Sequence, residues 1–483
     1  MRDKYCKVAA IAIVLLALAA SYVLVTASAV SVVIRAVLEV LMLAAAGIGI
    51  QRALSFNGGF GLYLLSSKKG LRYIDGISKH NQVFWRSMAM WGFVLGFGVL
   101  SYPLMRGKLS KKLFAFGLLS LAAMYVFVTP YLGYSLQFIN LSAIQGSVST
   151  ATSTHASLLS YVVAAITLLF GFSGFAIVSI FYSAATILYG IGRYVAGVIS
   201  GSASAASALS GQVPGVVPII PGLDIPFAAG IISLVILLTV HELSHGVLSR
   251  IFGAKLKSLG LLMFGILPIG AFVEPEDKTI KKLAPEKQTG IFSAGIAANF
   301  VAMLVFFALM FATMLYIAPR AYSYGVVVSG TTPGYPAYNV LSIGSQVLQW
   351  NGQSVSNIGT LEIAASSDRP GKPVAVVTSA GAYTFNAIPN PSDASKGIIG
   401  VSMVYEPIIR GAKASLVYFL YTLFALSMLL NFLVAVFNLL PIPGLDVWSI
   451  YNANIRNKRL IRYITAIVLV AIAINALPWL FYV

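Results

Sequence analysis

Two histidines and a glutamate that could act together on one metal ion lie near the middle of this sequence. They form the run His241-Glu-Leu-Ser-His245, within an apolar stretch that we expect to be helical over 225–252. Residues four apart in a helix lie on one face, so both imidazoles can reach a single ion. Glu242, next to the first histidine, is placed to act as a general base on a water molecule bound to the ion. Zinc lowers the pKa of such a water to about 7, so a nearby carboxylate can take its proton. The run predicts a catalytic zinc site.

The setting of this run indicates a function rather than an incidental polar stripe. The chain has four histidines, and two of them make the pair. The pair follows Leu237-Leu-Thr-Val240 at the end of an apolar stretch, where ionisable side chains are costly unless they have a role. The other two histidines, His80 and His155, are distant in the sequence, and we interpret them as surface residues.

A catalytic zinc site needs a third protein ligand, with the fourth position open for water. A third histidine at the metzincin spacing is excluded because position 251 is Ile. Besides Glu242, only Glu39 and Asp446 among the 14 acidic residues lie within or at the end of an apolar stretch. Asp446 follows Asn438-Leu-Leu-Pro-Ile-Pro-Gly-Leu445, a helix end that its prolines interrupt, at the same expected depth as the histidines. Asp446 is the predicted third ligand.

The composition requires a membrane to position these residues. Hydrophobic residues make up 58% of the chain, charged residues only 10%, and the mean hydropathy is +0.88. Several apolar stretches approach or exceed the roughly 20 residues that a helical span needs. The plainest are 8–28, 86–104, 113–129, 225–247, 292–318, 413–440 and 463–482. The sequence predicts a polytopic α-helical protein of the cell membrane.

In a soluble protein the net charge of +18 would suggest nucleic acid as a partner, but its distribution in this chain does not. The lysines and arginines gather between the apolar stretches, which favours anionic lipid head groups and cytoplasmic loops as their surroundings. Cys6 is the only cysteine, so neither an intrachain disulfide nor a cysteine-based zinc site is possible. The apolar run after Lys7 is too long for a signal peptide, and we expect a first transmembrane helix with its N-terminus inside.

Four regions follow one another along the chain. Residues 1–200 form an N-terminal multi-span block, and 201–320 the first part of the catalytic core. Residues 321–407 alternate apolar and polar side chains between turns such as Asn351-Gly352, which predicts a small soluble β-rich insert. Residues 408–483 complete the core with a last helical pair.

The structure of one long run in the N-terminal block stays open at this stage. The long apolar run 158–198 fits one helix with a re-entrant piece, or two short helices.

The distribution of basic residues predicts an orientation in the membrane. The basic loop after 247 and the less basic insert place the active site near the cytoplasmic side and the insert outside. The two basic loops of the N-terminal block flank a single apparent span, so this orientation also needs a re-entrant or interfacial segment near 56–66.

Taken together, the two distant motifs resemble the site-2 protease family of intramembrane metalloproteases. Asn438, Pro441, Leu445 and Asp446 match the family's Asn/Pro…Leu-Asp-Gly motif, with Val447 in place of its Gly. Gly265-Ile-Leu-Pro-Ile-Gly-Ala-Phe-Val273 resembles the loop or edge strand after the first core helix. Ala294-Gly-Ile-Ala-Ala-Asn299 resembles a Gly-Pro-x-x-Asn segment, with Ile296 in place of Pro.

The resemblance implies three core helices around one Zn²⁺, with Glu242 as general base and acid. It implies that Asn438 lies near the scissile carbonyl, where its amide could donate to the developing oxyanion. The strand-like run 260–273 could pair with an unwound substrate segment, which makes Gly270 and Phe272 candidate substrate-binding residues. Asn299 is a further candidate for substrate binding, with helix packing as its alternative role.

The insert resembles a PDZ domain. Tyr324-Gly-Val-Val-Val328 looks like the carboxylate loop and the peptide-binding strand, and Gly344-Ser-Gln-Val-Leu-Gln-Trp-Asn-Gly-Gln353 looks like the middle strands and turn. PDZ domains take peptides by strand addition. The insert could therefore bind a peptide, admit only substrates whose outer domain has been trimmed, or simply pack.

The predicted function is zinc-dependent hydrolysis of peptide bonds within the transmembrane segments of membrane-protein substrates. One alternative is a membrane zincin of another type, with Glu274 or Glu276 as third ligand. A second alternative is a non-catalytic metal-binding scaffold or transporter. Glu242 argues against the second, because transport needs no general base beside the ligands.

Overall fold

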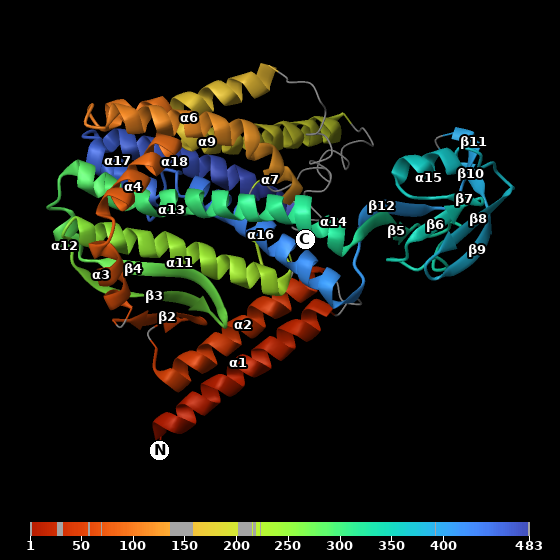
Figure 1. Cartoon of the computed structure of the whole chain (residues 1–483), viewed down its shortest axis with the longest axis horizontal. Helices are drawn as coiled ribbons and strands as arrows, with labels where there is room; N and C mark the ends of the chain where they lie inside the picture. Colours follow the sequence, from red (N-terminus) through yellow and green to blue (C-terminus); the bar gives the residue numbers. More distant parts are fainter. Residues whose placement is uncertain are drawn as a thin grey trace. The chain divides into compact units, whose positions relative to one another are not determined.

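The computed structural model describes residues 2–26, 32–56, 58–68, 70–135, 158–200, 215, 219–222, 224–391 and 393–481. The contacts divide the chain into two units, Met1–Leu309 with Thr422–Val483, and Met310–Tyr421. The first unit is mainly helical, and the second contains the residues predicted to form the insert (Figure 1). His155 lies outside the described residues.

The helices of the first unit follow the apolar stretches of the sequence. They are α1 (Arg2–Thr26), α2 (Val32–Leu54), α3 (Leu71–Lys79), α4 (Gln82–Phe97), η1 (Gly98–Leu100), α5 (Ser101–Leu104), α6 (Lys111–Phe127), α7 (Thr129–Ser135), α9 (Leu158–Ile199), α11 (Phe227–Ile251), α12 (Asp277–Ile280), α13 (Pro285–Ala312), α16 (Gly411–Phe437), α17 (Asp446–Asn454), α18 (Lys458–Ala476) and η4 (Leu477–Phe481). Helices α13 and α16 each continue into the second unit.

Eight of the described helices are long and apolar enough to cross a membrane. They cover Tyr5–Leu24, Val37–Leu54, Gln82–Leu104, Tyr161–Ile199, Phe227–Ile251, Pro285–Ala321, Gly411–Phe437 and Lys458–Trp479. Many of their large apolar side chains are exposed, including Leu16 and Leu41, which suits lipid and would not suit water. The predicted polytopic helical membrane protein with a β-rich domain is confirmed.

Helix α9 is broken at Gly171, where φ is 66° and ψ is −162°. The break faces the end of α4: a Cβ on Gly171 would lie 2.3 Å from the carbonyl carbon of Gly96, and one on Gly98 would lie 2.3 Å from the Leu168 carbonyl oxygen. Only glycine permits both the positive φ and this close approach. Of the two interpretations left open for 158–198, the structure has two helical segments.

Helix α13 packs closely against α4, and this contact fixes one wall of the site described below. A Cβ on Gly92 of α4 would lie 2.3 Å from the Ala297 Cβ and 2.6 Å from its Cα. On the same side of α13, a Cβ on Gly290 would lie 2.9 Å from the ring of Phe252, the residue after α11. Small residues let the backbones of membrane helices approach in this way. Helix α13 therefore has little room to shift.

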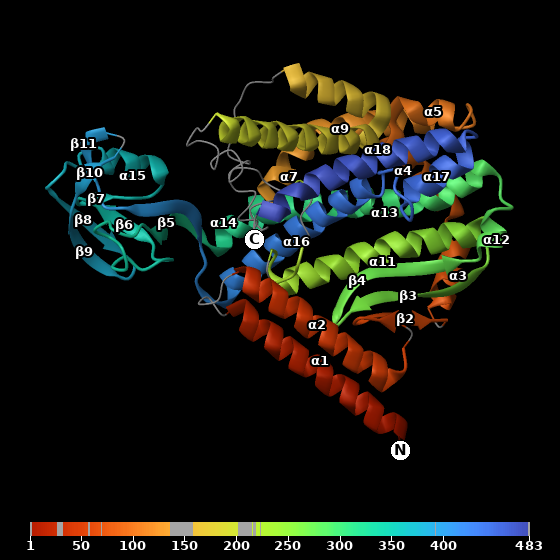
Figure 2. The ribbon, with the colours of Figure 1, turned by 180° about the vertical axis from the view of Figure 1, so that it is seen from behind.

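A four-stranded antiparallel sheet lies beside α11 (Figure 2). Its strands are β1 (Gly58–Gly59), β2 (Leu62–Ser67), β3 (Leu256–Phe264) and β4 (Leu267–Pro275), in the order β1-β2-β3-β4. The segment near 56–66, expected to be re-entrant or interfacial, forms a strand hairpin, and its second strand pairs with β3, with Leu62 opposite Phe264. The run 260–273 forms most of the β3–β4 hairpin. Because β4 is last in the strand order, it is an edge strand of this sheet.

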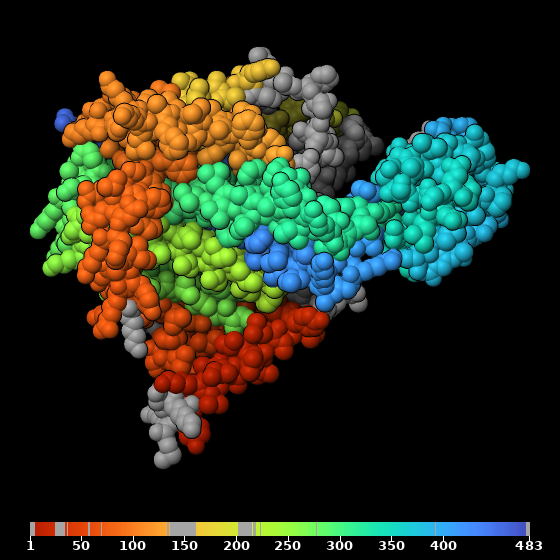
Figure 3. Space-filling view, in the orientation of Figure 1, coloured from red at the N-terminus to blue at the C-terminus, as the bar shows by residue number. Residues whose placement is uncertain are grey.

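Helix α3 follows this hairpin and joins it to α4. Its apolar side packs against α11 through Ile74, which is almost fully buried beside Val247. The opposite side exposes Tyr73, and Asp75 forms an ion pair of 2.7 Å with Arg250 at the end of α11. In the space-filling view α3 and α4 form an orange column along one edge of the first unit (Figure 3).

In the second unit the end of α13 is followed by η3 (Thr313–Ile317) and α14 (Ala318–Ala321), and then by strands with one short helix among them. The strands are β5 (Ser323–Thr331), β6 (Val347–Trp350), β7 (Gln353–Ser354), β8 (Pro373–Thr378), β9 (Gly381–Asn386), β10 (Ile388–Asn390), β11 (Asp393–Ile398) and β12 (Val401–Ile408). They pair as β7-β6-β8-β9, β12-β5 and β10-β11. The helix expected near 359–367 is α15 (Ile358–Ala365), which a reciprocal capping box of Asn357 and Thr360 starts.

The assignment of residues 324–328 as the peptide-binding strand of a PDZ domain is wrong. Strand β5 pairs with β12 along its length, with Tyr324 opposite Pro407 and Val328 opposite Met403. On its other edge Val327 bridges Gln346, and the Val328 N–H donates to the Ser345 carbonyl at 3.0 Å. A peptide can be added only to a strand edge that is free. Both edges of β5 are occupied here.

Candidate metal centre

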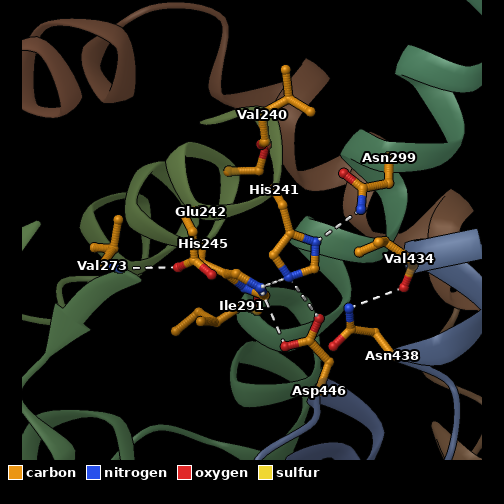
Figure 4. A network of polar contacts seen from close by, with 11 residues as sticks. Val240, His241, Glu242, His245, Val273, Ile291, Asn299, Val434, Asn438 and Asp446 are labelled. Atoms are coloured by element: carbon orange, nitrogen blue, oxygen red, sulfur yellow. Dashed lines mark hydrogen bonds and ion pairs between the residues drawn. The ribbon is translucent and has the colours of Figure 1, made fainter. Parts of the chain in front are cut away.

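Three side chains from two distant parts of the chain meet at one point. His241 Nε2 lies 3.4 Å from Asp446 Oδ2, and His245 Nε2 lies 3.2 Å from Asp446 Oδ1. The two Nε2 atoms are 3.2 Å apart (Figure 4). The three side chains each offer one ligand atom, and these atoms all lie within 4.8 Å of one another. Among the described residues, this is the group of three that could hold a metal ion.

The sequence around Asp446 explains how its carboxylate reaches the histidines. Helix α16 ends at Phe437, because Pro441 and Pro443 cannot continue its hydrogen bonding. Gly444 has a φ of 94°, and α17 then starts at Asp446. The Val447 N–H donates to the Asn438 carbonyl at 3.1 Å and ties this turn to the end of α16. Val447 is fully buried, so the turn accommodates valine at the position where the resemblance expected glycine.

The surroundings of the three side chains fit a zinc ion. Asp446 Oδ2 is buried and has no hydrogen-bond partner. A buried carboxylate oxygen needs a compensating partner, and a bound cation would provide one. Two imidazoles and one carboxylate are a donor set found in catalytic zinc sites. Helix α13 leaves space for the site: a Cβ on Gly295 would lie 2.3 Å from His245 Nε2 and 2.7 Å from His241 Nε2. The donors converge, and the helix opposite them has no side chain to fill the space.

Glu242 lies between the histidines and the sheet. Its Oε2 accepts a hydrogen bond of 2.9 Å from the backbone N–H of Val273 on β4. It also lines a mostly apolar cavity of about 270 Å³ between α11, α3 and the sheet. The cavity is lined by Leu65, Ser67, Ile74, Thr239, Glu242, Leu243, Leu259, Gly260, Leu261, Ala271, Phe272 and Val273. The one acidic side chain that lines this cavity therefore belongs to the residue that directly follows His241.

Comparison with known proteins identifies the family. The sequence profile of peptidase family M50 matches residues 229–477, slightly more than half of the chain. The chain belongs to peptidase family M50. This is the family of the site-2 proteases, so the resemblance inferred from the two motifs is confirmed. The matched residues include His241, His245 and Asp446, and the family is one of membrane metalloproteases.

A curated relative of this M50 chain is an uncharacterized protein of Methanocaldococcus jannaschii, MJ0971. The two sequences are 30% identical over 232 residues, which cover 47% of this chain and 58% of the relative. The chain therefore aligns with somewhat more than half of that protein's length. The relative's name assigns no activity that could be compared with the site.

Asn299 and Asn438 occupy different places around the M50 site. Asn299 is fully buried on α13, and its Nδ2 lies 3.2 Å from His241 Nδ1, on the side of the ring away from Asp446. Asn438 donates from Nδ2 to the Val434 carbonyl of its own helix at 3.0 Å. Asn299 is thus a neighbour of a candidate ligand, whereas Asn438 forms part of the end of α16.

The two candidate substrate-binding residues on β4 also differ. Phe272 lines the cavity beside Glu242, and its ring lies over Gly260 of β3, where a Cβ would be 2.8 Å from Phe272 Cζ. Gly270 is opposite Leu262 in the β3–β4 pair, where a Cβ would be 3.4 Å from the Leu262 Cβ. Only Phe272 of the pair is among the residues that line the cavity.

Glu274, one of the alternative third ligands, is bound elsewhere. Its Oε1 forms an ion pair of 2.8 Å with Lys257 Nζ, and its Oε2 accepts a hydrogen bond of 3.0 Å from Ser258. These two contacts hold the pKa of the Glu274 carboxyl below its usual value. Glu276 begins the turn into α12, where its carbonyl accepts from Thr279. Neither side chain belongs to the group around the histidines.

Sequence reasoning missed three groups that shape the M50 site. They are the Ile291 carbonyl, which lies 2.8 Å from His245 Nδ1, the bare Cα of Gly295, and the Val273 N–H that holds Glu242. Two of them are backbone groups, which no residue type marks. Gly295 could have been found, because it lies four residues from Ile291 and four from Asn299 and so shares their helical face.

Proposed function

We propose that this M50 chain is a zinc-dependent intramembrane endopeptidase that hydrolyses peptide bonds within the transmembrane segments of membrane proteins. The observation that carries the proposal is the meeting of His241, His245 and Asp446 beside Glu242. The two histidines come from a helix that is long and apolar enough to cross a membrane. A hydrolytic site at such a depth would act on peptide bonds that lie within the bilayer.

In this proposal His241, His245 and Asp446 hold the ion. When bound, zinc would supply a Lewis acid that activates water and polarises the scissile carbonyl. Glu242 takes a proton from the attacking water and returns it to the leaving amide nitrogen. The Val273 N–H fixes the direction of the Glu242 carboxylate, which keeps its other oxygen available for that proton. Asn438 has a second N–H besides the one given to Val434, and this donor would meet the developing oxyanion.

The edge of β4 is the proposed docking site for an unwound substrate segment. On this edge the Val273 N–H already binds Glu242, whereas the N–H of Ala271, two residues earlier, points to the same side and would pair with the substrate. A helical substrate hides its peptide bonds, so it must extend before it can be cut, and an edge strand can pair with an extended chain. Gly270 and Phe272 would then contact the substrate, with Phe272 bordering the cavity that takes a side chain next to the scissile bond.

The size of this cavity predicts the effect of truncating Phe272. In Phe272→Ala the cavity gains the space of a ring, so residues larger than the natural ones should be accepted beside the cut site. We expect the ratio of kcat/KM for reporters with Phe and with Ala at that position to rise about tenfold or more. Competing reporters analysed by mass spectrometry measure this ratio. Phe264→Ala, on β3 and outside the cavity lining, should leave it unchanged, and the same ratio in both variants would refute this role.

The charge distribution supports an orientation for the molecule. The segment 247–288 is rich in lysine and the insert is not, so we propose that the active site lies near the cytoplasmic side and the insert outside. The basic segments, which include helix α3 with Arg72 and Lys79, would contact anionic lipid head groups. The insert would contact a peptide or the ectodomain of a substrate, through surfaces other than β5.

Purified protein in detergent tests the function, with a single-span reporter as substrate. The wild-type chain should cut the reporter within its transmembrane segment and contain one zinc ion. Asp446→Ala should lose most of the zinc, because a ligand is gone, whereas a Glu274→Ala/Glu276→Ala double variant should keep both zinc and cleavage. Metal analysis and mass spectrometry of the products give both readouts. Zinc loss in the glutamate variant with retention in Asp446→Ala would support the alternative zincin, and zinc binding without any cleavage would support a scaffold or transporter.

A further inference from the structure

Helix α13 meets both histidines with a single stripe of residues. Ile291, Gly295 and Asn299 are spaced four apart, so they lie on one face of the helix. Ile291 and Asn299 contact the Nδ1 atoms of the two rings, which point away from Asp446. Gly295 lies between them, against the Nε2 atoms. The stripe thus reaches every ring nitrogen of the two imidazoles.

The hydrogen bond of His245 fixes where its proton lies. Its Nδ1 is 2.8 Å from the Ile291 carbonyl oxygen, and a carbonyl oxygen can only accept. Nδ1 therefore carries the hydrogen in the neutral ring, and Nε2 presents a lone pair toward Asp446 and the metal position. This is the form in which an imidazole binds a metal ion.

The hydrogen bond of His241 has the opposite consequence. Asn299 faces its Nδ1 with Nδ2, and an amide nitrogen can only donate. Nδ1 then accepts, and the hydrogen of the neutral ring is on Nε2, the nitrogen that lies 3.4 Å from Asp446 Oδ2. A ring with hydrogen on Nε2 cannot use that nitrogen as a ligand.

The oxygen of the same amide could instead accept a hydrogen bond from His241 and so free its Nε2. Asn299 Oδ1 is buried and has no hydrogen-bond partner, so it is free to become an acceptor for His241. Half a turn of the amide about its last side-chain bond exchanges Oδ1 and Nδ2. Oδ1 would then accept from Nδ1–H of His241, and Nε2 would be free to bind the ion. The shapes of the two amide orientations are nearly the same, so packing around Asn299 need not change.

We propose that Asn299 is a positioning residue of the metal centre, whose amide turns over as the site fills. One orientation stabilises the His241 tautomer with its hydrogen on Nε2, and the other stabilises the tautomer that ligates. Asparagine suits this task because its side chain carries both a donor and an acceptor at similar positions. The inference rests on the proposed zinc site and adds to it a residue that touches neither metal nor substrate.

Zinc affinity of the purified full-length chain tests the proposal, measured by competition with a chelator. Asn299→Leu keeps the volume but removes both polar atoms, and zinc should bind about 10- to 100-fold more weakly. Asn299→Asp keeps the acceptor that the ligating tautomer needs, so it should restore affinity to the wild-type value or above. Asn431→Leu is the matched control, since Asn431 is an equally buried asparagine on α16 that bonds only within its helix. Its affinity should equal that of the wild type.

A measurement on the unmutated chain covers the case in which Asn299→Leu fails to fold. Nitrogen NMR of histidine-labelled protein should show His241 with its hydrogen on Nε2 without zinc and on Nδ1 with zinc, whereas His245 should carry it on Nδ1 throughout. Wild-type affinity in Asn299→Leu, or an unchanged His241 tautomer on zinc binding, would overturn the proposal. Absence of zinc from the wild-type chain would instead overturn the proposed function, so the two failures are distinct.

Discussion

Glu242→Gln should abolish cleavage while leaving zinc in place. Glutamine has nearly the same shape, and its Oε1 can still accept the hydrogen bond from the Val273 N–H that the carboxylate accepts at 2.9 Å. It cannot take a proton from water at neutral pH. Since general acid–base groups contribute typically about 10²- to 10⁴-fold, we expect kcat on a transmembrane reporter to fall by at least that amount.

Two measurements on the same purified sample separate chemistry from binding in this variant. Metal analysis should find one zinc ion per chain, as in the wild type, and timed mass spectrometry of the reporter should find no product above background. Glu286→Gln is the matched control, because Glu286 is a carboxylate at the start of α13 that pairs with Lys108 and lies outside the site. It should cleave normally. Cleavage retained in Glu242→Gln would contradict the assigned role.

Gly295→Ala should weaken zinc binding severely. The new methyl carbon would lie 2.3 Å from His245 Nε2 and 2.6 Å from His241 Cε1, well inside contact distance of both rings. Helix α13 has no room to withdraw, because Ala297 is already in close contact with Gly92 of α4. The imidazoles would have to turn, which would break the arrangement with Asp446. We expect zinc affinity to fall by more than the roughly 100-fold that the loss of an outer hydrogen bond can cost.

Chelator competition measures this loss, and thermal unfolding in the same detergent shows whether the fold persists. Gly192→Ala makes the same substitution in the transmembrane helix α9, where nothing lies within 4 Å of the added carbon. That control should keep wild-type zinc affinity and stability. Equal zinc affinity in Gly295→Ala and Gly192→Ala would mean that α13 does not form the wall of the site.

The candidate ligands could be predicted because local chemistry marks them. His241 and His245 are half of the histidines of the chain, and Asp446 is one of few acids at the end of an apolar stretch. Burying an ionisable side chain in a transmembrane segment is costly, so such residues are rare there and their presence is informative. The turn before Asp446 could also be inferred from Pro441, Pro443 and Gly444, whose backbone preferences interrupt α16.

Pairing between distant segments could not be predicted in the same way. Leu62-Tyr-Leu-Leu65 is a short apolar run that fits several structures, and it becomes a strand only because β3, almost two hundred residues later, offers an edge. The apolar stretch of α2 was not among the plainest spans, and it contains the charged residues Arg35 and Glu39. The structure buries Glu39, whose carboxylate accepts a hydrogen bond of 2.6 Å from the Ser21 hydroxyl of α1. In both cases a tertiary contact decides what the local pattern leaves open.

The role of Asn299 shows a different limit. Its position in Ala294-Gly-Ile-Ala-Ala-Asn299 indicated a place in the core, and substrate binding was one of its possible roles. Which partner its amide meets depends on how α13 rotates against α11, and this is set by contacts such as Gly92 with Ala297. The helical spacing identified the face, and only packing identifies the neighbour.

X-ray absorption at the zinc edge, on the purified full-length chain, tests the central claim most directly. We predict one zinc ion per chain with two nitrogen ligands at about 2.0–2.1 Å and oxygen ligands at about 2.0–2.2 Å. In Asp446→Ala the signal should be lost or reduced to weakly held metal, because the carboxylate is the third protein ligand. Wild-type protein without stoichiometric zinc, or an unchanged spectrum in Asp446→Ala, would contradict the account.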